Sequence, residues 1–202
     1  NAGTYESFNE QNDASFEFWF RADDTGAGAA DQVIWETGGT GDGASLTIRN
    51  GDLAFIAKDG GNSLVASTPI PEGEFVHAVA TYERDNPGNT DTLTLYLNGI
   101  QAAIDTETAV NDWSGGNGAA IAGANSQTGG SGNGFNLQAG FETFDGQIAI
   151  NRFFENTTLT ADEVQDLFNS VAAVPEPASI AVWGLLGLLG VGFARYRMRK
   201  KG

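Results

Sequence analysis

Short stretches in which apolar and polar residues alternate recur through most of this chain, and they constrain its fold more than any other feature. In one of them, Phe16, Phe18 and Phe20 take alternate positions. Successive side chains of a β-strand point to opposite faces, so these three rings share one face. The other face carries Glu17, Trp19 and Arg21. Clusters of Gly, Asn and Asp separate the stretches, which favours an all-β, antiparallel sandwich.

Two of the separating clusters contain the dipeptide Asn-Gly. Asn50-Gly51 follows the stretch "SLTIR", and Asn98-Gly99 follows "LTLYL". Asn-Gly is favoured in type I′ turns because both central residues of that turn need a positive φ. The sequence therefore predicts a β-hairpin at each position.

One short helix is predicted near residue 165. Thr160 and Glu163 have the spacing of a capping box, and Leu159 with Val164 can form a hydrophobic staple around it. An apolar stripe with helical spacing follows, made of Val164, Leu167, Phe168 and Val171. We expect this stripe to pack against the sandwich.

The last 29 residues differ from the rest of the chain. Residues 178–194 carry no charge, and as a helix of ~1.5 Å per residue they would span about 25 Å, close to a hydrocarbon core of about 30 Å. A buried core helix is the alternative, but this stretch is apolar on every face and runs into a cationic tip. The tip contains Arg195, Arg197, Arg199, Lys200 and Lys201. Because positive residues stay on the cytoplasmic side, a single C-terminal transmembrane helix would leave the tip inside and the body outside.

Val174-Pro175-Glu176-Pro177 marks the boundary between body and tail. Two prolines at this spacing cannot continue a helix and favour an exposed, extended segment. Pro-Glu-Pro, apolar span and Arg-rich tip together resemble the PEP-CTERM sorting signal of Gram-negative bacteria. The resemblance implies that the span holds an exported protein at the inner membrane until an exosortase-type enzyme cleaves near Pro-Glu-Pro. It divides the chain into a body, residues 1–173, and a signal, residues 174–202, made of the motif (174–177), the span (178–194) and the basic tip (195–202).

Charge is distributed unevenly between body and tip. Five of the ten Lys and Arg residues lie in the last eight positions, whereas all 26 Asp and Glu residues precede Pro177. Residues 1–176 therefore have a formal charge of −21 and the tip +5, which disfavours nucleic acid as a partner of the body. The chain has no cysteine, so disulfides and thiolate chemistry are excluded.

Candidate catalytic residues are few in the body. His77 is the only histidine and lies in the predicted strand "FVHAVATY", where no acid, base or nucleophile is positioned beside it in the sequence. Sandwich-fold glycosidases place carboxylates at alternate positions of one strand, and no such Glu-x-Asp run lies in a strand here. We therefore expect no catalytic residues and no enzymatic activity.

Several blocks of the body, in this order, resemble the laminin-G-like, concanavalin-like jelly rolls of bacterial surface proteins. The blocks are "SFEFWFRADD", "GEFVHAVATYE" with "LTLYLNGIQAA", "AAIAGAN", and "FDGQIAINRFF" with "LTADEVQDLF". The resemblance runs from about Ser15 to Ser170 and implies that the family's first strand lies before Asn1. Two positions depart from the family. Phe75 replaces the usual Trp, and Ala149 replaces an Asp that can ligate a structural calcium.

Ligand and metal candidates are confined to predicted loops. Trp113, just before the Gly-rich segment 125–134, is a candidate for stacking on a sugar ring, although a half-buried structural Trp is the alternative. No cofactor and no metal site are predicted, and calcium held by loop oxygens is the one exception that the sequence leaves open. Its candidate ligands are Asp42, Asp52, Asp59, Asp112 and Asp145.

The expected function follows from the body and the tail together. A non-catalytic binding module for a carbohydrate or protein ligand would be exported, anchored in the inner membrane, and then released to the cell surface or the extracellular matrix. Its partners would be an exosortase-type processing enzyme, the inner membrane, and an extracellular polysaccharide or surface protein. The alternative is the accessory domain of a larger secreted carbohydrate-active enzyme truncated before residue 1.

Overall fold

The computed structural model describes residues 13–25, 31–38, 43–49, 51–59, 62–86, 90–108, 110, 120–123 and 142–172, and every structural statement below concerns these residues. They form β1 (Asp13–Ala22), β2 (Gln32–Gly38), β3 (Gly43–Arg49), β4 (Asp52–Asp59), β5 (Asn62–Pro69), β6 (Phe75–Asn86), β7 (Thr90–Leu97), β8 (Ile100–Thr108), β9 (Ala120–Ile121), β10 (Glu142–Thr143), β11 (Gly146–Glu155) and α1 (Ala161–Ala172). The chain has two compact units, Asn1–Asp166 and Leu167–Gly202. The strands all belong to the first unit.

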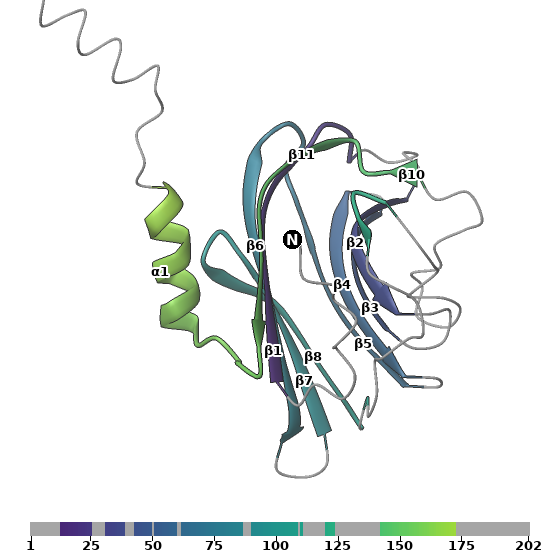
Figure 1. Ribbon diagram of the computed structural model, residues 1–202, viewed down its shortest axis with the longest axis vertical. Helices are drawn as coiled ribbons and strands as arrows, with labels where there is room; N and C mark the ends of the chain where they lie inside the picture. Colours follow the sequence, from purple (N-terminus) through teal and green to yellow (C-terminus); the bar gives the residue numbers. More distant parts are fainter. Residues whose placement is uncertain are drawn as a thin grey trace, which may run out of the picture. The chain divides into compact units, whose positions relative to one another are not determined.

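The strands form two sheets that face each other (Figure 1). Sheet A has the order β11-β1-β6-β7-β8, and sheet B has the order β10-β2-β3-β4-β5, with β9 also paired to β2. Every described pair is antiparallel except the short pairing of β10 with β2. The predicted antiparallel jelly-roll sandwich with one short helix is therefore confirmed.

Aromatic rings fill the space between the sheets. The ring of Phe16 in β1 lies 4.8 Å from that of Trp35 in β2 and 5.0 Å from that of Phe55 in β4, measured between centroids. Phe18 and Phe20 are buried in the same core. The predicted inward face of β1 is thus confirmed, because each of its three phenylalanines contributes to one cluster with both sheets.

The outward face of β1 is also buried. Ser15 is 0% exposed, and its Oγ donates a hydrogen bond to the Thr157 carbonyl (2.8 Å) and accepts one from the Leu159 N–H (2.9 Å). These two bonds attach the segment before α1 to β1. The Ser15 hydroxyl is therefore satisfied inside the unit and does not face solvent.

Both predicted hairpins are present. Leu97 pairs with Ile100 across Asn98 (φ 51°) and Gly99 (φ 82°), so the two central residues have the positive φ that a type I′ turn requires. Arg49 pairs with Asp52 across the other turn.

The helix begins as predicted. The Thr160 N–H donates to Glu163 Oε2 (2.8 Å), and the Glu163 N–H donates to Thr160 Oγ1 (3.3 Å), which is the reciprocal pattern of a capping box. The hydrogen bond from the Thr160 backbone lowers the pKa of the Glu163 carboxyl. Val164 and Leu159 are buried. The rest of the stripe lies in the second unit, and its packing against the sandwich stays a prediction.

Strands β5 and β8 are each the last strand of their sheet. They are joined by a side chain: the Val65 N–H in β5 donates to Asp105 Oδ2 in β8 over 2.7 Å. The carboxylate therefore crosses from one sheet to the other at this side of the sandwich.

Within the described ranges, no helix has both the length and the apolar composition to cross a membrane. The predicted span, residues 178–194, lies outside those ranges.

Candidate ligand-binding site

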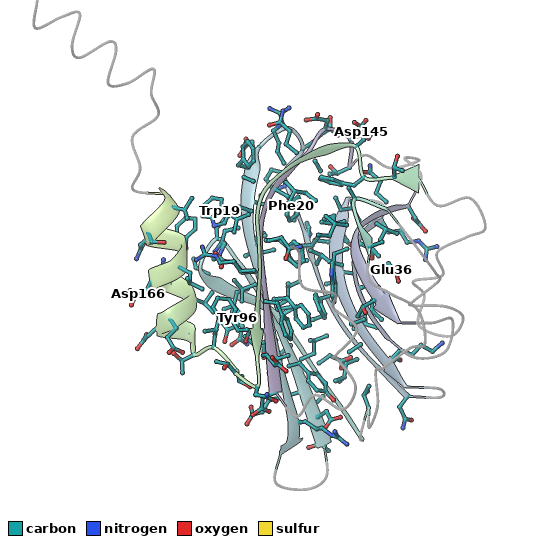
Figure 2. All side chains as sticks on the ribbon, viewed as in Figure 1. Trp19, Phe20, Glu36, Tyr96, Asp145 and Asp166 are labelled. Atoms are coloured by element: carbon teal, nitrogen blue, oxygen red, sulfur yellow. The ribbon has the colours of Figure 1, made fainter. Side chains whose placement is uncertain are left out.

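The outer face of sheet B, which points away from sheet A, carries four enclosed polar side chains: Glu36, Ser45, Thr47 and Lys58. We call this set the polar face. Glu36 and Ser45 are 0% exposed, Thr47 is 1% exposed and Lys58 is 7% exposed. Figure 2 shows Glu36 on this outward side of β2, whereas Phe20 lies on the other side of the sheet. Polar groups this deeply enclosed need hydrogen-bond partners.

Strand register places the four side chains near one another. Glu36 in β2 pairs with Ser45 in β3, and Ser45 pairs with Ile56 in β4. Thr47 is two residues beyond Ser45 along β3. Lys58 is two residues beyond Ile56 along β4, toward the opposite end of the strands from Thr47. Residues at alternate positions share a face, so all four belong to one surface.

Two members of the polar face have unmet hydrogen-bonding capacity. Ser45 Oγ and Thr47 Oγ1 have no hydrogen-bond partner. Among the described acids, none lies within ion-pair distance of Lys58, whereas Arg21, Arg49 and Arg152 each contact a carboxylate. An enclosed polar group without a partner costs about 1–3 kcal/mol, and a charged one costs more. The polar face is therefore unfavourable for stability as it stands.

A second polar cluster lies on the outer face of sheet A and contains a buried carboxylate with an ion pair. The Glu17 carboxylate accepts from Arg152 Nη2 (2.9 Å), lies 2.7 Å from Arg152 Nε, and lies 3.2 Å from His77 Nε2. The Trp19 ring stacks on the His77 imidazole with centroids 4.9 Å apart. Glu17 and His77 are both 0% exposed. His77 is thus part of a packed cluster with one carboxylate, which is itself occupied by Arg152.

A third group of polar residues lies at the end of the sandwich where β1 and β11 meet the loops. The Gln32 side chain donates from Nε2 to the Asp24 carbonyl (2.7 Å) and accepts at Oε1 from the Asp145 N–H (2.9 Å). The Asp23 N–H donates to the Asp145 carbonyl (2.9 Å). The Asp145 carboxylate is exposed, as Figure 2 shows. These bonds involve backbone groups and the Gln32 amide. They position the loops, but they do not bring carboxylates together.

The position of Ala149 has a structural explanation. Trp19 pairs with Ile150 and Phe20 pairs with Ile148, so Ala149 is the extra residue of a β-bulge in β11. A methyl group offers no oxygen for calcium. No group of three or more His, Asp or Glu residues suited to a metal ion was found in the part of the chain that the structure describes.

Calcium removal is therefore expected to have little effect on stability. Without the ligating Asp, a chelator should change the melting temperature of the protein by less than about 4 °C, the range that ~1 kcal/mol produces in a domain of this size. The measurement compares thermal unfolding of the full chain in EDTA with unfolding in excess calcium. A larger fall in EDTA would show that loop oxygens form a site.

Several predicted site residues lie outside the described ranges. These are Trp113, Asp42, Asp112, the motif Val174–Pro177, and the cations from Arg195 to Lys201. The roles assigned to them stay predictions. Asp52 and Asp145 are described, and they lie in separate parts of the fold, at the start of β4 and just before β11.

The polar face was missed in the sequence because its pattern is ordinary. In "GASLTIR", Ser45 and Thr47 alternate with Ala44, Leu46 and Ile48, as in any strand with one solvated face. Only their burial distinguishes them from surface residues, and burial of both faces of one strand is a tertiary property.

Comparison with known proteins identifies the type of fold. The sequence model of Laminin_G_3, described as the concanavalin A-like lectin/glucanases superfamily, matches residues 2–165. No curated protein sequence is significantly similar to the chain.

Solved structures give the same result at low sequence identity. The chain is similar to the binding domain of botulinum neurotoxin DC in complex with SialylT (14% identity, TM-score 0.56, covering 79% of this chain and 36% of that chain). It is similar to the heptameric SAP-like pentraxin from Limulus polyphemus (14%, 0.54, 82% and 73%) and to domains LG4-5 of the mouse laminin alpha1 chain (12%, 0.50, 71% and 35%). The chain thus spans about a third of the toxin and laminin chains. At these identities the likeness shows the fold alone.

Proposed function

Because the chain belongs to the concanavalin A-like lectin/glucanase superfamily, we propose that it is a non-catalytic binding module for a carbohydrate ligand. The observation that carries this proposal is the match of the superfamily's sequence model to residues 2–165. Two enclosed hydroxyls without hydrogen-bond partners, Ser45 Oγ and Thr47 Oγ1, add support, because a ligand that reached them would supply the missing hydrogen bonds. Carbohydrates, which present hydroxyls in every direction, are the ligand class that fits best.

The superfamily name covers both lectins and glucanases, and the carboxylates favour binding over hydrolysis. Glycoside hydrolysis generally uses two carboxyl groups about 5–9.5 Å apart. Glu36 is the one acid of the polar face. It pairs with Ser45, which in turn pairs with Ile56 in β4. Asp52 lies four residues from Ile56 along the same strand. Four residues of a strand cover about 14 Å, which is too far for the pair to act together.

The test is a binding assay with a catalytic control. The full chain is applied to a panel of oligosaccharides that covers neutral, acidic and amino sugars, and the same oligosaccharides are assayed for newly formed reducing ends. We expect binding of at least one oligosaccharide and no release of reducing sugar. Hydrolysis of any member, or the absence of binding to every member, would contradict the proposal.

We further propose that the module is exported and that residues 174–202 act as its temporary anchor. The apolar span 178–194 would hold it in the inner membrane with the body outside, and an exosortase-type enzyme would cut near Pro175-Glu176-Pro177. The support is the order of motif, span and basic tip in the sequence. Moving the tip through hydrocarbon costs about 2.5–3.5 kcal/mol per cation even on a lenient scale, so the orientation would be fixed.

Mass spectrometry of surface and matrix protein from the native host tests the anchor. Mature chains should end close to Val174–Pro177, and they should reach the cell surface or the extracellular polysaccharide matrix. Mature surface protein that retains residues 178–194 would contradict cleavage and leave a permanent anchor.

A further inference from the structure

We propose that a row of three accessible side chains on the outer face of sheet A, Gln147, Arg21 and Phe75, binds a flat, neutral oligosaccharide. This inference rests on the proposed binding function, to which it adds a place on the fold and a class of ligand. Gln147 is in β11, Arg21 is in β1 and Phe75 is in β6, and these three strands are neighbours in sheet A. We call the three side chains the exposed row.

Strand register places the exposed row in one line across the sheet. Arg21 pairs with Gln147 on one side and with Phe75 on the other. Phe20, the residue before Arg21, belongs to the core between the sheets, so Arg21 and its two partners point outward. Directly paired residues have Cβ atoms about 5 Å apart, which makes the row about 10 Å long. A row of that length matches a disaccharide or a trisaccharide.

The exposed row is accessible, in contrast to the enclosed polar face of sheet B. Phe75 is 45% exposed, the Arg21 side chain is 31% exposed, and Gln147 is exposed. The other large apolar side chains exposed in the described ranges are isoleucines, so Phe75 is the one exposed aromatic residue among them. A ligand therefore reaches this row from solvent without entering a cavity.

Arg21 is held between the Phe75 ring and a carboxylate. Its guanidinium carbon lies 6.0 Å from the centroid of the Phe75 ring, at the outer limit of a cation–π contact. Its Nε donates a hydrogen bond to Asp23 Oδ1 over 2.8 Å. The two terminal amino groups of the guanidinium, with four N–H donors, are not used in that bond. Arg21 is thus positioned before a ligand arrives and retains donors for it.

The three side chains provide complementary contacts for a sugar chain. The C–H face of a pyranose ring is apolar and stacks on an aromatic ring such as that of Phe75. The planar Arg21 guanidinium can donate two parallel hydrogen bonds to neighbouring hydroxyls, and the Gln147 amide can both donate and accept. An aromatic ring at one end of the row and polar planar groups along the rest therefore suit consecutive sugars of one chain.

The charges around the exposed row favour a neutral ligand. The one cation of the row, Arg21, is already paired with Asp23. Asp145, labelled in Figure 2, is also exposed, and its carbonyl accepts a hydrogen bond from the Asp23 N–H over 2.9 Å. Residues 1–176 have a formal charge of −21, so the protein repels acidic polysaccharides over long distances.

The shape of the row favours a flat chain. The three side chains stand on adjacent strands of one sheet and form a straight line rather than a concave groove. A β-1,4-linked chain of hexoses is extended and can contact all three side chains at once. An α-1,4-linked chain of the same sugar is curved and would leave the row after one or two contacts.

The experiment uses two tetrasaccharides of glucose that differ only in linkage, cellotetraose (flat) and maltotetraose (curved). The β-1,4-linked tetramers of mannose and xylose extend the flat set. Affinity for the full chain is measured by calorimetry, with and without added salt. The variants are Phe75→Ala, Phe75→Trp, Arg21→Met and Gln147→Ala. The control is Ile104→Ala, which removes an exposed apolar side chain from β8, at the opposite edge of the same sheet.

We expect at least one flat tetrasaccharide to bind the wild type about tenfold more tightly than maltotetraose, with an affinity that salt does not change because the ligand is uncharged. Phe75→Ala should weaken binding about tenfold, and Arg21→Met and Gln147→Ala about threefold each. Phe75→Trp should retain the affinity, and its added fluorescence should change on binding. Ile104→Ala should bind like the wild type. Since the substituted side chains are accessible, every variant should unfold close to the wild type.

Four results would overturn the inference. Binding that Phe75→Ala leaves unchanged would place the ligand elsewhere. Equal affinity for cellotetraose and maltotetraose would remove the requirement for a flat chain. If no flat tetrasaccharide binds but another member of the oligosaccharide panel does, the binding function stands and the exposed row is not its site. If no member of the panel binds, the proposed function fails and this inference fails with it.

Discussion

Replacing Gly146 with alanine should lower the free energy of unfolding by about 3 kcal/mol and the melting temperature by about 6–12 °C. Gly146 is the first residue of β11, with φ at 158°, and it pairs with Ala22 in β1. A Cβ atom here would overlap the Arg21 carbonyl oxygen and lie 2.6 Å from Phe144 Cζ. The obstacle is backbone of a central strand, so relief requires β1 or β11 to move.

Gly123→Ala is the matched control for this substitution. A Cβ at Gly123 would meet only Thr143 Cγ2, at the ordinary contact distance of 3.8 Å. Thermal and urea unfolding of the two variants should therefore differ clearly, with Gly123→Ala within about 1 kcal/mol of the wild type. Similar melting temperatures for both variants would mean that the start of β11 adapts to a side chain.

Arg152→Met should cost a comparable amount, about 3 kcal/mol. The substitution keeps the aliphatic stem on the sheet but removes the guanidinium that contacts both oxygens of Glu17. Glu17 is 0% exposed. Of the two described side chains that contact its carboxylate, only the His77 imidazole would remain. A buried carboxylate deprived of its cation is one of the few single changes with an effect this large.

Arg21→Met provides the comparison for the ion pair. Arg21 lies on the same face of β1 as Glu17, but its pair with Asp23 is exposed, with side chains 31% and 41% accessible. Exposed pairs are worth less than about 1 kcal/mol, so this variant should unfold close to the wild type. Equal losses for Arg152→Met and Arg21→Met in urea titrations would show that the burial of Glu17 has no energetic consequence.

Local rules predicted the elements of the fold well. Asn98-Gly99 needs only its own two φ angles to specify a hairpin, and Thr160 with Glu163 needs only a spacing of three to begin α1. The alternation in β1 likewise identified the inward phenylalanines. In each case the residues that determine the structure are close together in the sequence.

Contacts between distant residues could not be predicted in the same way. Glu17 and Arg152 are 135 positions apart, and their meeting depends on β11 returning beside β1. The bulge at Ala149 shifts register by one residue, which no alternation pattern indicates. The polar face exists because both sides of β3 are buried. That burial depends on the packing of the whole unit and not on the sequence of β3 alone.

The bond between Val65 and Asp105 has a consequence for self-association. A terminal strand of a sheet presents unpaired N–H groups that can template a strand from another molecule, which is how many sandwiches aggregate. At Val65 that donor is already taken by the Asp105 carboxylate of the neighbouring sheet. An incoming strand would have to displace the carboxylate to dock at Val65, so this position of the sheet edge is protected against edge-to-edge polymerisation.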